Sequence, residues 1–142
     1  MSVSQQKLAR FMQGVRADVD GYRALRSLLV AQFDAALRHE TAALEDLAGS
    51  IVELTAELEA RREERVALAR EWAPGGAAVG MPTLLGLLPP TARDALSSWW
   101  STLEQLVHEC KAQNMRNCRL MVEQNEVMRR VLNQEEATYA PG

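Results

Sequence analysis

The stretch that decides the fold is Leu44–Trp72, LEDLAGSIVELTAELEARREERVALAREW. Its seam steps by three and four residues throughout, through Leu44, Leu47, Ile51, Leu54, Leu58, Arg61, Arg65, Leu68 and Trp72. This spacing predicts a long helix packed nearly parallel to another helix. Pro74-Gly75-Gly76 ends it, so we expect a helix over 41–72, about 45 Å long at roughly 1.5 Å per residue. A rod of that length needs partner helices to bury its stripe.

Residues 4–38 supply the first predicted partner, because apolar residues recur there with the same rhythm. They are Leu8, Phe11, Val15, Val19, Tyr22, Leu25, Leu29, Phe33 and Leu37. Gly14 and Gly21 weaken this helix by roughly 1 kcal/mol each relative to Ala. The join at Arg38-His39-Glu40 holds no Gly or Pro, so either a tight turn or one continuous helix is compatible with it.

Residues 73–90 contain most of the Gly and Pro and form a connector. The connector is too apolar for a free linker, with Met81, Leu84, Leu85, Leu87 and Leu88, so we expect a short helical turn that docks on the bundle. A third helix is predicted over 91–136, followed by a loose tail at 137–142.

These elements predict an all-α, single-domain protein. Ala, Leu, Glu, Arg and Gln, which favour helices, dominate a composition that is 47% hydrophobic and 25% charged. The expected architecture is a long antiparallel helical hairpin plus a third long C-terminal helix, an elongated three-helix bundle.

Charge and hydropathy restrict the partners. The net charge is -3 and neither half is a polycation, so nucleic acid and anionic membranes are not expected partners. The polar N-terminus has no apolar signal region, and no run approaches the roughly 18 apolar residues that span a bilayer. Cys110 and Cys118 would stand roughly 12 Å apart along one helix, too far for a disulfide. Free thiols predict a cytoplasmic protein.

No constellation of residues predicts catalysis, a cofactor or a metal. Glu104 and His108 share a helical face, but a di-metal bundle needs a Glu-x-x-His pair twice. His39 and His108 are the only histidines, and neither cysteine has a helix N-terminus or a Cys-x-x-Cys partner to activate it. We therefore expect no enzyme. Arg61 and Arg65 occupy seam positions, which suggests that the bundle opens there.

The third helix changes character at Cys110. Before it the seam is Leu, Trp and Val; after it come Asn114, Asn117, Gln124 and Asn125, mixed with methionines. Amides and methionines favour a partner-binding face. The alternative is a polar layer that sets the register of the helices. Because amides replace apolar seam residues, we expect residues from about Asn114 onward to be less stable than the hairpin at 8–72.

Two segments resemble the FlgN family of flagellar export chaperones. The first is the leucine-rich hairpin from Leu25 through Leu58 to Arg62, and the second is Asn114-x-x-Asn117-x-x-Leu120-Met121, followed by an amphipathic helix to Leu132. The resemblance covers most of residues 8–135. It implies a protein that binds the C-terminal helical segments of hook-associated proteins, here called clients, prevents their premature assembly and delivers them to the type III export gate.

The resemblance and the change of seam together give the predicted partner-binding residues: Asn114, Asn117, Cys118, Met121, Asn125, Met128 and Leu132. Tyr139 is a candidate for docking on the export gate, with an idle tail tyrosine as the alternative. The competing hypothesis is a structural coiled-coil protein without a client, in which the same face forms a homodimer.

Overall fold

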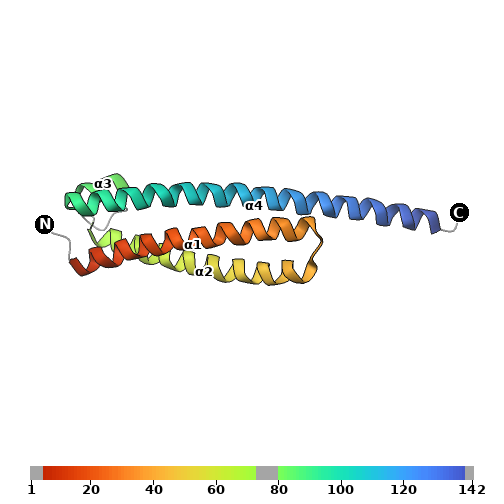
Figure 1. Cartoon of the computed structure of the whole chain (residues 1–142), viewed down its shortest axis with the longest axis horizontal. Coiled ribbons are helices and arrows are strands. Elements are labelled where there is room, and N and C mark those ends of the chain that lie inside the picture. The colour runs from red at the N-terminus through yellow and green to blue at the C-terminus, as the bar shows by residue number, and fades with distance from the viewer. Residues whose placement is uncertain (1–4, 73–79, 140–142) are drawn as a thin grey trace.

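Three long helices and one short helix make up the protein in a computed structural model, which describes residues 5–72 and 80–139 (Figure 1). They are α1 (Gln5–Leu37), α2 (Thr41–Trp72), α3 (Met81–Gly86) and α4 (Pro90–Tyr139). The predicted all-α fold with three long helices is confirmed. Helix α4 continues through Tyr139, beyond the predicted end at 136. Residue 4, residues 73–79 of the connector and residues 140–142 of the predicted tail lie outside the described residues.

Helix α1 is the central element and contacts both α2 and α4. Helix α2 returns antiparallel to α1, whereas α4 runs parallel to it (Figure 1). The parallel direction follows from three contacts, because Cys110, Asn117 and Gln124 each meet an α1 residue 88 positions earlier. Only helices that run the same way keep such a constant separation.

A tight turn joins α1 to α2, which settles the alternative that the sequence left open. His39 adopts a left-handed conformation with φ 55°. The His39 amide donates to the Ala36 carbonyl at 3.2 Å, and the Glu40 amide donates to the Ala35 carbonyl at 3.0 Å. This pair of bonds is the Schellman motif, in which glycine is the usual residue at the left-handed position. The turn was hard to predict because histidine stands in that place.

The connector contains the expected short helix. Helix α3 begins directly after Gly80 and has Pro82 in its first turn. Leu84 of α3 and Leu88 just beyond it are both buried. This segment closes one end of the bundle, and the burial of these two leucines explains why its sequence is so apolar.

Two clusters of buried side chains hold the helices together. The proximal core, at the α3 end, consists of Phe11, Val15, Val19, Leu68, Leu84, Leu88, Leu96, Leu103 and Leu106. The distal core is smaller and consists of Leu25, Leu29, Leu58 and Cys110. In α2 only Leu58 and Leu68 are fully buried among the seam positions. The other α2 leucines are half-buried because α4 packs mainly against α1 and leaves one side of α2 open.

The two seam arginines of α2 meet a buried carboxylate on α1. Asp18 is 2% exposed and forms ion pairs with Arg65 and, at 3.3 Å, with Arg61. Burial raises the pKa of Asp18, and the two arginines act in the opposite direction. The helices stay close beside this cluster: a Cβ on Gly21 would lie 2.8 Å from Leu58 Cδ2. The prediction that the bundle opens at Arg61 and Arg65 was therefore wrong, because the carboxylate of Asp18 on α1 pairs with both arginines between the helices.

Candidate protein-interaction site

A ladder of side-chain hydrogen bonds joins the second half of α4 to α1. Cys110 Sγ donates to the Tyr22 carbonyl at 3.5 Å, Asn117 Nδ2 to the Leu29 carbonyl at 2.7 Å, and Gln124 Nε2 to the Ala36 carbonyl at 2.8 Å. The donors lie one heptad apart on α4, and the acceptors lie one heptad apart on α1. Each donor reaches a backbone oxygen, so the ladder fixes how far α4 is shifted along α1.

Asn117 is the centre of this ladder and is 1% exposed. Its Nδ2 also donates to Gln32 Oε1 at 2.8 Å, and its Oδ1 accepts from Gln113 Nε2 at 2.9 Å. The amide of Asn117 is thus satisfied within the chain. For Asn117 and Gln124 the structure favours the register-setting alternative over direct contact with a partner.

The other predicted site residues form a stripe along α4. Asn114, Cys118 and Asn125 are exposed and Met121 is half-buried, while Met128 and Leu132 are 57% and 59% exposed. Their spacing of three and four residues places them on one side of the helix. We call these six residues the α4 stripe: Asn114, Cys118, Met121, Asn125, Met128 and Leu132.

Helix α4 extends well beyond the end of α1 (Figure 1). In the observed register Leu37, the last residue of α1, lies level with Asn125. Residues 126–139, here called the overhang, therefore have no α1 beside them. Val127, Met128, Val131 and Leu132 of the overhang are exposed large hydrophobic residues. The overhang continues the α1-facing seam into solvent, and such a surface is typical of a binding site.

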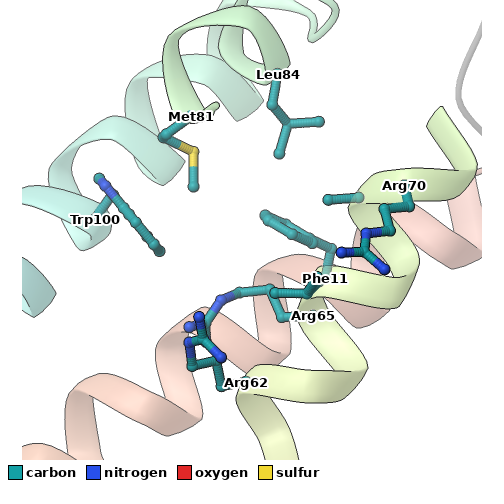
Figure 2. A pocket seen from close by; sticks show the side chains of 9 residues that line it. Phe11, Arg62, Arg65, Arg70, Met81, Leu84 and Trp100 are labelled. Atoms are coloured by element: carbon teal, nitrogen blue, oxygen red, sulfur yellow. The ribbon is translucent and has the colours of Figure 1, made fainter. Parts of the chain in front are cut away.

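A second feature is a groove floored by α1 and walled by α2 and α4. At its α3 end lies a hollow of about 490 Å³, here called the basic hollow. Figure 2 shows the Phe11 ring between Trp100 and Met81 on one side and the arginines of α2 on the other. The hollow is lined by Phe11, Arg62, Arg65, Val66, Ala69, Arg70, Met81, Leu84 and Trp100.

Further along the same groove lies a second hollow of about 300 Å³. Tyr22, Leu25 and Leu29 of α1 form its floor. Its walls are Ile51 and Thr55 of α2 and Val107, Cys110, Lys111 and Asn114 of α4. Asn114 is also the first residue of the α4 stripe, so the groove leads directly onto the stripe.

The two cysteines differ in environment, although both are free thiols as expected. Cys110 is buried in the distal core, and this burial raises the pKa of its thiol. Cys118 is exposed on the stripe. Cys110 is a packing residue because it is buried, and its raised pKa makes the thiol a poor nucleophile.

The described residues define an all-helical binding protein. They contain no group of three His, Cys, Asp or Glu side chains that could hold a metal ion. No helix among them is long and apolar enough to cross a bilayer. What they offer is an exposed apolar overhang and an open groove, both of which suit another polypeptide.

The chain belongs to the FlgN family. Residues 1–134 match the model of this family, which is described as FlgN protein. It is thus a flagellar export chaperone for hook-associated proteins, in a family that is not enzymatic. Comparison with curated proteins and with solved structures gave no match. The family assignment confirms the resemblance drawn from the leucine-rich hairpin and the Asn-x-x-Asn segment. It leaves no support for a structural coiled coil without a client.

Proposed function

We propose that this chaperone holds the C-terminal helical segment of its client on the α4 stripe and the overhang, acting in the cytoplasm before export. The observation that carries the proposal is the exposure of four large hydrophobic residues on the overhang, where no α1 lies beside them. A client helix that packs against Met128 and Leu132 buries its own apolar surface, which would otherwise drive premature assembly of the client.

The predicted site residues have two roles in this proposal. The six stripe residues contact the client. Asn117 positions them, because its bonds to Leu29 and Gln32 hold α4 at one register on α1. Binding through the Asn117 side chain itself would require α4 to leave α1, and nothing in the proposal needs that step.

The test is client binding by a variant of the overhang, measured by isothermal titration calorimetry with a purified hook-associated protein from the same organism. Met128→Ala with Leu132→Ala should weaken binding by at least about tenfold, since each buried apolar side chain contributes roughly 1.5–3 kcal/mol. Both residues are exposed, so the free protein should keep its stability.

The matched control is Glu126→Ala with Arg130→Ala. These residues lie on the opposite side of the same helical turns, and the pair leaves the net charge unchanged. Affinity should stay within about twofold of wild type. Equal loss in both double variants, or in neither, would contradict the proposed site.

Delivery to the export gate is the second part of the proposal and rests on Tyr139, the last residue of α4. Tyr139 ends the overhang, the part of α4 that has no α1 beside it. Tyr139→Ala should leave client affinity unchanged but reduce binding of the client complex to a purified export-gate component. Unchanged gate binding would support the alternative that Tyr139 has no role in docking.

A homodimer is the remaining alternative for the overhang. Native mass spectrometry of the free protein over a range of concentrations distinguishes the two occupants. A dimer that Met128→Ala with Leu132→Ala disrupts, together with unchanged client affinity, would assign the overhang to a second copy.

A further inference from the structure

The charged side chains that line the two hollows between α2 and α4 are all basic. Arg62, Arg65 and Arg70 line the basic hollow and Lys111 lines the second hollow, and no carboxylate lines either one. The chain as a whole carries 19 acidic against 16 basic side chains. In an acidic protein, hollows whose only charged lining residues are cations favour an occupant with negative charge.

The cations are concentrated at the end of the groove that α3 closes. Arg65 is already engaged there, since it pairs with Asp18 and its guanidinium lies 5.5 Å from the centre of the Trp100 ring. Arg62 and Arg70 are exposed, and no ion pair involves either of them within the part of the chain that the structure describes. These two guanidinium groups are available to a ligand.

The rest of the basic hollow is apolar and shaped for a peptide side chain or a chain end. The Phe11 ring and Leu84 are almost fully buried, and Met81 and Trp100 are half-buried across from the arginines (Figure 2). A purely anionic ligand would not need this lining. An apolar peptide that ends in a carboxylate uses both the lining and the arginines.

The length of the surface sets the length of the occupant. From Trp100 to Asn114 the groove wall spans about 21 Å, and from Trp100 to Leu132 groove and stripe together span about 48 Å. A helix of about 32 residues covers that distance. One end of such a helix would lie in the basic hollow and the other on the overhang.

We propose that the basic hollow binds the C-terminal carboxylate of the client, so that the client helix lies antiparallel to α4 with its last residue at Arg62 and Arg70. The negative end of the helix dipole and the terminal carboxylate then both face the arginines. The apolar side chains of the last turn enter the space between Phe11, Met81 and Trp100. This inference rests on the proposed function, and it adds the direction of the client and the group that is recognised.

The test compares two synthetic peptides with the sequence of the last 32 residues of a hook-associated protein from the same organism. One peptide ends in a free carboxylate and the other in an amide. Wild type should bind the amide about tenfold more weakly, the usual effect of losing a charge-assisted hydrogen bond. Arg62→Ala with Arg70→Ala should bind both peptides equally, at the affinity of wild type for the amide.

The control variant is Arg116→Ala with Arg119→Ala, which also removes two exposed positive charges, from α4 outside both hollows. It should keep the tenfold preference for the free carboxylate. Circular dichroism of each variant checks that the helices are intact, as expected for exposed residues.

The outcomes separate this inference from the proposed function. If wild type binds both peptides equally, or if Arg62→Ala with Arg70→Ala keeps the preference, the carboxylate site is overturned. Loss of binding in the Met128 and Leu132 variant would still support the overhang. If wild type binds neither peptide, both proposals fail. If the arginine variant alters only self-association, the hollow belongs to a second copy and the inference is overturned.

Discussion

The two ends of the α1–α4 contact are built from different chemistry. At the proximal end Leu96 and Leu103 of α4 pack among Phe11 and Val15, in a core that α3 closes. At the distal end the same face of α4 carries Cys110, Asn117 and Gln124, which bond to α1 carbonyls. One helix therefore joins a part stabilised by apolar burial to a part positioned by hydrogen bonds. Burial supplies more free energy, whereas the polar ladder supplies register.

The largest expected effect is in the proximal core. Leu96 is 0% exposed, and Leu96→Ala should lower the free energy of unfolding by about 4 kcal/mol, because a cavity is added to the lost apolar burial. Urea denaturation followed by circular dichroism measures the change. The control is Leu132→Ala on the overhang, expected within about 0.5 kcal/mol of wild type. Similar losses at the two positions would contradict the contrast between the ends.

The buried ion pairs of Asp18 should rank second. Asp18→Ala leaves Arg65 beside Trp100 without its carboxylate, and we expect a loss of about 3 kcal/mol in the same measurement. Asp20→Ala is the control, because Asp20 is exposed on the same helix and should change stability by less than about 0.5 kcal/mol. If Asp18→Ala proves as mild as the control, the cluster contributes nothing to the proximal end.

The polar ladder gives a smaller and more local effect. Asn117→Ala removes two donated bonds to α1, and we expect a loss of about 1.5 kcal/mol. Hydrogen exchange followed by mass spectrometry should show faster exchange over residues 118–125 and unchanged exchange in the proximal part of α4. Uniform acceleration along α4 would mean that the helix responds as a single cooperative unit.

Wild type in the same exchange experiment tests the expectation that residues 114–132 are less stable than residues 44–68. The structure supplies a reason for the difference in the last part of this segment, where α4 has no α1 beside it. Equal protection over the two segments would refute the expectation.

The smallest effect is expected at the turn beside the distal end. His39 holds a left-handed conformation that glycine adopts without strain. His39→Gly should therefore raise the free energy of unfolding by about 0.5 kcal/mol, since the relief of strain exceeds the added flexibility of the unfolded chain. The control is Arg38→Gly, one residue earlier, which should lower stability. A loss in both variants would show that the His39 side chain stabilises the turn.

The candidate site was predictable only in part. Spacing alone placed Asn114, Met121, Met128 and their neighbours on one face, and it found the change of character at Cys110. Spacing could not separate Asn117 and Gln124, which face α1, from the exposed amides of the α4 stripe, because the two sets of residues lie side by side on one helix. The basic hollow had no sequence signal, since its lining comes from four helices. The pairing of Asp18 with two arginines did have a sequence signal. Asp18 stands at a seam position of α1, where the neighbouring seam positions are apolar.

The sequence by itself determined the helices, the connector and the family, because helix propensity, heptad spacing and Gly/Pro punctuation are local properties of the chain. Tertiary structure alone decided which helix is central and how far α4 is shifted along α1. Those features depend on contacts between residues 88 positions apart, such as Asn117 with Leu29. The same shift decided where α1 ends beside α4. The seam beyond Asn125 is therefore exposed rather than buried against α1, and this is the surface where we propose that the client binds.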